Sequence, residues 1–486
     1  MANGWPNIRI DHQNQPAYDC YNCAIAVGPG APSHQPLYVV FQSDTLPGGR
    51  TDVWFQKSTD GGRTWLPEDV LIRHGNRYAF DPDITTDSDG NVCIVYTYET
   101  TPGDTARHFQ IVCVRSSDGG ATWTAPSRVD DDSSDDDSPN GSMVDVQIGS
   151  DSAGNLLCAW VDWRTGMSHI LSSVSTDGGA TWRRNVRVDD DTTDDGCFHP
   201  DVFVQPGTNQ YLVAADAYRW FGGHVIPCAY LYCSTDRGQT FQPGVQLDTF
   251  NYAASSPHVV ADRAHITCDY FGEAHYGDRM LVESRTFYTQ PDTWGTPHSV
   301  TNLDSLHDLY LSGTLALSGD GRVHTALMIC DVGGPGYNIF YASSSDHGVS
   351  WTGLELVDED TTLNSGCPDI GADSTGHAYV VWPHGNAGQF RIWFATNRPA
   401  GIAEQPLQVH VGTQPFATMF RNVLLLPEAT IPKPQAASLL DISGRKVMDL
   451  HPGANDVRAL APGVYFVKEA QAQAQAQAVR KVVVTR

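Results

Sequence analysis

The strongest constraint on the fold is a short motif that returns at a fixed period. Residues 58–65 read Ser-Thr-Asp-Gly-Gly-Arg-Thr-Trp, and close copies occupy residues 116–123, 175–182, 234–241 and 344–351. The spacings between copies are 58, 59, 59 and 110 residues, so the last interval holds two periods and one decayed copy near residues 289–294. A fixed period of this length indicates an architecture of repeated supersecondary units.

The motif itself has a local physical role. Its aspartate and its Ser or Thr hydroxyls can satisfy backbone donors in a tight turn, and its glycines allow positive φ. The terminal Trp or Phe can pack between neighbouring sheets. We therefore predict a structural role for the central aspartates, which are Asp60, Asp118, Asp177, Asp236 and Asp346.

Each period also contains an apolar inner strand, a turn and a second strand, as in residues 83–96. Residues 8–12 resemble the outer strand of a repeat with no repeat before them, and the last repeat lacks the motif. The N-terminal strand would complete that last repeat. The inner strands are expected to begin near Cys23, Asp83, Asp145, Asp201, His258, Thr314 and Asp369.

The eight-residue motif is that of the Asp-box, and residues 1–400 resemble the sialidase-like propeller superfamily. The resemblance and the repeat count together predict an all-β fold, a seven-bladed β-propeller closed by the N-terminal strand. Sialidases themselves have six blades. Here Arg9-Ile10 is followed by Asp11 where sialidases have proline, and no arginine triad or Tyr/Glu nucleophile pair can be assigned. True sialidase activity is therefore not expected.

Composition changes after residue 400, because four of the five lysines lie beyond residue 430. We expect a linker at 401–415 and a small C-terminal β-sandwich at 416–486. Residues 441–447, 462–467 and 481–484 resemble the sorting domain of the bacterial type IX secretion system. The resemblance implies that the type IX secretion machinery is a partner of this protein. It also implies an extracellular or outer cell-surface location. No signal peptide is present in the sequence, and we expect that one was removed. An accessory β-sandwich is the alternative.

The net charge of −26 disfavours nucleic acid and anionic membranes as partners. The sequence contains no run of about 18 apolar residues, so it predicts no membrane-spanning helix. Most of the 11 cysteines lie in strand-like apolar runs, where thiols act as small hydrophobes. A disulfide or metal role stays open for the loop residues Cys20, Cys23, Cys197 and Cys367.

In propellers of this kind the active site lies opposite the Asp-boxes, so we expect any ligand or metal on that face. The aligned starts of the inner strands bring several titratable groups there. They would act as acid/base carboxylates whose mutual repulsion raises some pKa values, or as a cation site. The alternative is that they cap neighbouring strands. The candidate catalytic residues are Asp83, Asp145, Asp201, His258 and Asp369.

Two acidic loops, residues 130–137 and 189–195, offer the hard oxygen ligands that calcium prefers. They predict calcium as a cofactor, held by Asp130, Asp132, Asp189 and Asp191. A solvated acidic rim is the alternative.

Loops after the second strands combine aromatic, arginine and acidic side chains, which is the mixture that sugar recognition uses. The predicted ligand-binding residues are Trp163, Arg164, Trp220, Tyr270, Glu273, His275 and His384. Two functions remain open. One is a secreted protein that binds or processes extracellular glycans, as a glycoside hydrolase or polysaccharide lyase if it is an enzyme. The other is a non-catalytic surface module for protein binding or self-assembly.

Overall fold

A computed structural model gives the fold of two units, Met1–Gly401 and Ile402–Arg486, which are described separately. The structure describes residues 5–12, 19–31, 34–46, 50–72, 78–100, 109–131, 144–190, 196–221, 224–248, 253–273, 280–288, 293–300, 307–331, 336–386, 389–398, 419–420, 423–426, 437–441, 445–451, 453–458, 460–461, 463–469 and 479–484.

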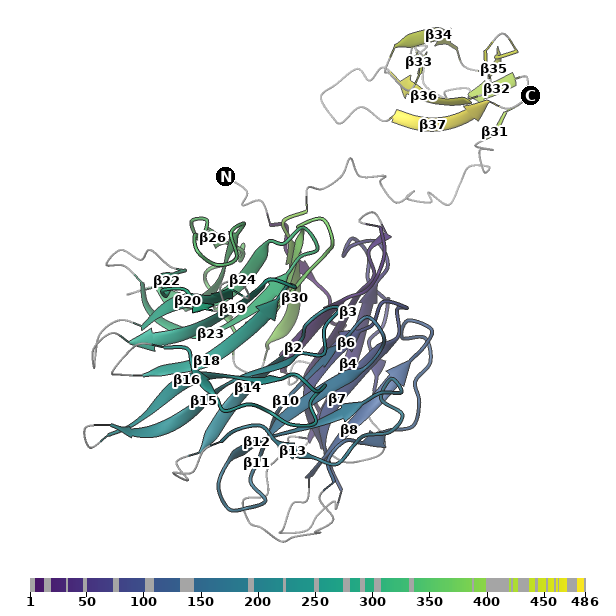
Figure 1. Ribbon diagram of the computed structural model, residues 1–486. Coiled ribbons are helices and arrows are strands. Elements are labelled where there is room, and N and C mark those ends of the chain that lie inside the picture. Colours follow the sequence, from purple (N-terminus) through teal and green to yellow (C-terminus); the bar gives the residue numbers. More distant parts are fainter. Residues whose placement is uncertain are drawn as a thin grey trace. The chain divides into compact units, whose positions relative to one another are not determined.

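Strands are the regular elements throughout these residues, and no α-helix occurs among them (Figure 1). The prediction of an all-β fold is confirmed. No helix of the described residues is long and apolar enough to cross a membrane.

The first unit consists of antiparallel sheets in which chain neighbours pair. The first two sheets are β2 (Cys20–Val27), β3 (Leu37–Leu46), β4 (Arg50–Ser58) and β5 (Val70–Leu71), then β6 (Ala79–Thr86), β7 (Val92–Glu99), β8 (Phe109–Ser116) and β9 (Ser127–Arg128). The next two are β10 (Val144–Ser150), β11 (Leu156–Asp162), β12 (His169–Ser175) and β13 (Val186–Arg187), then β14 (Cys197–Val204), β15 (Tyr211–Phe221), β16 (His224–Ser234) and β17 (Val245–Gln246).

The later sheets of this unit depart slightly from that plan. The fifth contains β18 (Ala254–Ala261), β19 (His265–Glu273), β20 (Met280–Tyr288), β21 (Thr293–Trp294) and β22 (His298–Ser299), and the sixth contains β23 (His307–Leu317), β24 (Val323–Asp331), β25 (Tyr337–Ser344) and β26 (Glu355–Leu356). The last contains β27 (Asn364–Ser365), β28 (Asp369–Ala372), β29 (Ala378–Gly385), β30 (Arg391–Thr396) and the N-terminal β1 (Ile8–Arg9). β1 pairs antiparallel with β30.

The Asp-box turns are built as the sequence predicts. In the second box, Asp118 accepts hydrogen bonds from the Ser116 hydroxyl at 2.7 Å and from the Thr122 N–H and hydroxyl at 2.8 and 2.6 Å. The other four central aspartates accept the same side-chain hydroxyl bonds. These bonds lower the pKa of Asp118. The aspartates therefore fasten turns and leave no carboxylate oxygen for catalysis.

Each box also inserts a glycine against the preceding sheet. A Cβ built on Gly120 would lie 2.5 Å from the Phe55 ring, and the glycine has φ +88°. Gly120→Ala is therefore expected to destabilise the protein by about 2–4 kcal/mol, from the left-handed backbone and the clash together. Gly166, with φ +86° and no atom within 4 Å of its Cβ position, is the matched control. Gly166→Ala should cost about 1 kcal/mol in urea unfolding. Equal losses would contradict the close packing.

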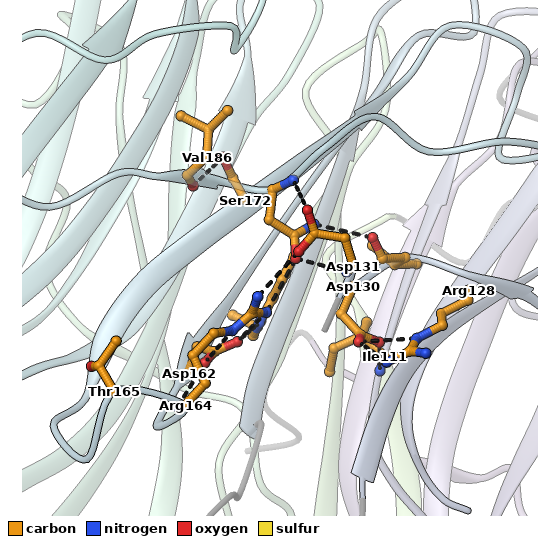
Figure 2. A network of polar contacts seen from close by, with 12 residues as sticks. Ile111, Arg128, Asp130, Asp131, Asp162, Arg164, Thr165, Ser172 and Val186 are labelled. Atoms are coloured by element: carbon orange, nitrogen blue, oxygen red, sulfur yellow. Dashed lines mark hydrogen bonds and ion pairs between the residues drawn. The ribbon is translucent and has the colours of Figure 1, made fainter. Parts of the chain in front are cut away.

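The short outer strands are held by an aspartate that follows them. Asp130 accepts bonds from the Ile111 N–H at 2.9 Å and from the Arg128 guanidinium at 2.7 Å (Figure 2). Asp189 repeats the arrangement with the Ile170 N–H and Arg187. The carboxylate thus ties the fourth strand to the third.

The second unit contains a mixed sheet in the order β31 (Met419–Phe420), β37 (Val479–Val484), β36 (Gly463–Glu469), β33 (Ala437–Leu440) and β34 (Lys446–Leu450). A separate pair joins β32 (Val423–Leu426) to β35 (Gly453–Asp456). The small core of the second unit contains Leu439, Leu450, Val457 and Tyr465. The predicted linker at 401–415 lies outside the described residues.

Candidate functional site

The inner strands share a bulge near their first residues, at the end of each sheet opposite the Asp-box. The register of β2, β6, β10, β14 and β18 shifts at this point. The bulged residue has a positive φ, between 45° and 53°, although it is not glycine. Such strained residues cluster at functional sites and re-aim side chains there. We call this set the bulge row: Asn22, Asp81, Asp145, His199 and Ser256.

Part of the bulge row forms a polar chain. The Asn22 amide donates to Asp81 Oδ1 at 2.7 Å. Burial and the nearby charge of Asp145 raise the pKa of Asp81 to about 6. Burial also raises the pKa of Asp145, while the charge of His199 lowers it. The charge of one carboxyl group therefore acts on the other, and Asp81 keeps its proton in mildly acidic solution.

His199 extends this chain to a buried acid on the second strand. Its Nδ1 lies 3.0 Å from Asp216 Oδ1, and its side chain is 49% exposed. Burial lowers the pKa of His199, but the hydrogen bond and charge of Asp216 and the charge of Asp145 raise it overall. Asp216 is fully buried, and its Oδ2 has no hydrogen-bond partner among the described residues. A buried acid that orients an exposed imidazole is a common arrangement in acid–base catalysis.

Aromatic rings border His199. Phe198 packs against Trp163 with ring centroids 5.7 Å apart and edge-on against Tyr218 at 5.3 Å. Carboxyl groups, an imidazole and aromatic faces therefore meet at one end of β10 and β14. This group, comprising Asp81, Asp145, His199 and Asp216 with the three aromatic residues, is the candidate site.

Most predicted catalytic residues lie two positions further along the inner strands and have structural bonds. Asp83 Oδ2 accepts the Ile148 N–H of the next sheet at 2.7 Å. Asp201 accepts the Val259 N–H, and Asp369 the Ile25 N–H, both at 2.7 Å. His258 Nδ1 lies 2.9 Å from Asp269 Oδ1. For the three aspartates the structure supports the alternative reading, in which the carboxylates cap neighbouring strands.

The bulges also correct the sequence alignment. Asp145 was aligned with Asp83, but its bulge position aligns it with Asp81 and His199, and Gln147 is the counterpart of Asp83. The sequence therefore missed Asn22, Asp81, His199 and Asp216. For Asp81 and His199, the available signal was a polar residue two positions before the capping residues Asp83 and Asp201. A bulge cannot be recognised from alternation alone.

The buried carboxyl groups make stability depend on pH. Burial, with the charges of Asp369 and Asp201, raises the pKa of Asp83 to about 8. Burial raises the pKa of Asp201 to about 6 and that of Asp358 to about 7. Because the folded state then holds protons that the unfolded chain releases above its ordinary pKa of 3.8, stability falls as pH rises from about 4 to 8.

We therefore expect the free energy of unfolding to be about 1–3 kcal/mol lower at pH 8 than at pH 5, measured by urea unfolding at constant ionic strength. A protein that is equally or more stable at pH 8 would contradict the burial of these groups. The lowered pKa values of the Asp-box carboxyl groups have the opposite effect on the pH dependence of stability. These groups titrate below pH 5, so they do not change the expected difference between pH 5 and pH 8.

The predicted ligand-binding residues differ in their exposure and contacts in the structure. Trp163 is half-buried in the candidate site, and Trp220 is 66% exposed near the tip of the β15–β16 hairpin. Arg164 is held by Asp162 at 2.8 Å and by Asp131 at 3.1 Å (Figure 2). Its guanidinium therefore lies in an internal ion-pair network.

Two further residues that were predicted to contact a ligand have buried side chains. Tyr270 is fully buried, and its hydroxyl donates to Glu283 at 3.2 Å. His384 is 6% exposed, and its Nδ1 lies 2.9 Å from the Ser365 hydroxyl. The side chain of Glu273 and the whole of His275 lie outside the described residues.

The predicted calcium ligands Asp130 and Asp189 have the strand-fastening role described above. Asp132 and Asp191 lie outside the described residues. Among the described residues, Cys20, Cys23, Cys197 and Cys367 form no disulfide. Cys367 is exposed, whereas Cys20 and Cys23 on β2 and Cys197 on β14 are buried strand residues, where the sequence predicted loops.

Comparison with known proteins agrees with the repeat. Residues 35–268 match the family model of the BNR repeat-like domain. This match spans four Asp-boxes, at residues 58–65, 116–123, 175–182 and 234–241. No curated protein matches the chain.

Several solved structures are similar to most of this chain at low sequence identity. A protein of unknown function from Dyadobacter fermentans is 14% identical, with a TM-score of 0.44 and coverage of 81% of this chain and 98% of its own. A Hadza microbial sialidase is 17% identical, with a TM-score of 0.44 and coverage of 75% and 74%. The alpha-L-arabinanase of Penicillium chrysogenum, complexed with arabinobiose, is 13% identical, with a TM-score of 0.44 and coverage of 80% and 97%.

Proposed function

We propose that this protein binds and hydrolyses extracellular glycans at the candidate site. The observation that carries the proposal is the pair Asp81 and Asp145, two interacting carboxyl groups on adjacent inner strands whose pKa values are raised. Glycoside hydrolysis needs one carboxyl group that donates a proton to the leaving oxygen and one carboxylate that acts as base or nucleophile.

The roles follow from the protonation states. Asp81, with a pKa of about 6, keeps its proton in mildly acidic solution and is the proposed general acid. Asp145, next to His199, is the proposed base or nucleophile. His199, oriented by Asp216, would hold a substrate hydroxyl, and Trp163 with Phe198 would supply the apolar face for a sugar ring.

A panel of neutral and acidic polysaccharides, screened for both turnover and binding, tests this proposal. Release of reducing ends is the expected result. An unsaturated product absorbing in the ultraviolet would indicate a lyase in place of a hydrolase. Binding that Trp163→Ala weakens, without any turnover, would reject catalysis but keep glycan recognition at this site.

The alternative of a non-catalytic surface module has one observation in its favour. Trp220 and Val225, paired across the β15–β16 hairpin, are 66% and 42% exposed. Exposed apolar pairs of this kind are frequent in protein contacts. Self-association that Trp220→Ala abolishes, in a protein inert toward the whole panel, would favour the module.

We also propose that the sheets of residues 5–398 are the seven blades of a closed β-propeller. Contacts between inner strands run from β2 through β6, β10, β14, β18 and β23 to β28, and β28 contacts β2. The Asp369 bond to Ile25 joins the last sheet to the first, and β1 completes the last sheet. A low-resolution electron micrograph or scattering curve of the first unit would test the ring.

For the second unit we propose export through the type IX system and a surface or extracellular location. The support is the sequence resemblance of residues 441–447, 462–467 and 481–484. Cell fractionation of the full chain and of a chain ending at residue 401 tests this proposal. The shortened chain should stay inside the cell envelope, and normal release would reject the role.

A further inference from the structure

Three potential metal ligands meet at the Asp-box end of the fifth and sixth sheets, away from the candidate site. Asp262 lies in the turn between β18 and β19, His265 is the first residue of β19, and His347 lies in the Asp-box turn that follows β25. Their ligand atoms all lie within 4.8 Å of one another, and this is the group of such residues found among the described parts of the chain. The sequence placed metal on the opposite face.

The distances fit a small tetrahedral ion. His265 Nδ1 lies 3.3 Å from Asp262 Oδ2, and His347 Nδ1 lies 3.4 Å from the same oxygen. Two ligands at the usual zinc distances of about 2.0–2.1 Å are separated by about 3.3–3.4 Å in a tetrahedron. Each nitrogen therefore stands at the separation from this oxygen that a shared ion requires.

The turn holds Asp262 in place for this role. Asp262 Oδ1 accepts the N–H groups of Ala264 and His265 at 2.7 and 2.8 Å. The two imidazoles stack with centroids 3.7 Å apart and an interplanar angle of 16°, and both turn Nδ1 toward the carboxylate. Because a bound ion lies in the plane of each imidazole, coordination by both nitrogens requires one ring to rotate out of the stack. The three side chains are 24–31% exposed, so water can reach a fourth coordination position.

His347 occupies a position that favours glycine. It follows the central aspartate of its box, where three other boxes have Gly61, Gly119 and Gly178 with φ from 66° to 75°. His347 has φ +59°, the left-handed region that a side chain rarely adopts. Its backbone carbonyl is held by the hydroxyls of Thr267 and Thr286 on the fifth sheet. Arg237 occupies the same position of the fourth box with φ +60°, so the left-handed backbone belongs to the turn, and in the sixth sheet this turn places the His347 imidazole beside Asp262 and His265.

We propose that Asp262, His265 and His347 form a zinc site that joins the fifth and sixth sheets. Two imidazole nitrogens and one carboxylate suit zinc and disfavour calcium, which prefers oxygen ligands. Zinc binds the folded arrangement and not the unfolded chain, so it stabilises the protein.

The experiment uses the full chain, freed of metal by a chelator and titrated with zinc chloride. Calorimetry should give one zinc ion per chain, and the thermal midpoint should rise with zinc. His347→Gly restores the residue of the other boxes, so this variant should fold normally without metal and lose both the binding and the thermal shift. His265→Ala should lose them as well.

His377→Ala is the matched control, because His377 Nδ1 lies 3.1 Å from Asp373 in the corresponding turn of the last sheet. It should keep the full zinc response. Absence of binding by the parent protein would overturn the proposal, as would an unchanged response in His347→Gly or loss of the response in His377→Ala. These readouts do not involve glycans, so they stand apart from the proposed hydrolysis.

Discussion

Trp5→Ala is expected to lower the free energy of unfolding by about 3–5 kcal/mol, the usual cost of truncating a fully buried tryptophan. Trp5 is 1% exposed although it lies close to the N-terminus. Its ring packs at 4.7 Å from Tyr341, and its indole N–H donates to Glu355 at 3.2 Å. The truncation would leave a cavity beneath the first strand and remove this hydrogen bond.

Trp220→Ala is the matched control, because the same side chain is lost where it is 66% exposed. This change should alter stability by less than about 0.5 kcal/mol. Urea unfolding followed by circular dichroism measures both variants. If Trp5→Ala lowers the free energy of unfolding by no more than Trp220→Ala does, the buried packing of Trp5 does not stabilise the first unit.

The second large effect concerns the proposed chemistry. Asp81→Asn should reduce kcat by roughly 10²–10⁴-fold, because the amide cannot donate the proton that the leaving oxygen needs. The parent activity should fall as pH rises above about 6, the pKa to which Asp81 is raised. That limb of the pH profile should disappear in the residual activity of the variant.

Asp89→Asn provides the control, since Asp89 is an exposed residue at the opposite end of the same sheet. Its kcat should match the parent, and both variants should unfold at similar urea concentrations. Full activity in Asp81→Asn would remove Asp81 from the mechanism. A loss confined to KM would instead assign it to substrate binding.

Sequence reasoning was strongest where the physics is local. The Asp-box closes its own turn with bonds between residues two to four positions apart, so its role can be read from eight residues. The all-β fold follows from the same repeats. The strands lie between the boxes and the other turns, and they can be predicted from the local sequence without knowledge of their pairing partners.

Only part of the candidate site could be predicted from the sequence. Alternation located the inner strands, but a bulge adds a residue and changes which side chain faces the open end. Asp145 was therefore recognised but placed in register with Asp83, and Asp81 and His199 were missed. Burial decided the opposite cases, since Tyr270 and His384 look like surface aromatic and polar residues in the sequence.

The sequence alone determined that this chain is built from repeated antiparallel sheets held by Asp-box turns, because each turn satisfies its own backbone donors. Only the tertiary structure decided which polar residues are free for chemistry and which fasten neighbouring sheets. Asp83 and Ile148 are 65 residues apart, and Asp262 and His347 are 85 apart. Such pairs meet only when whole sheets pack, and no local pattern encodes that contact.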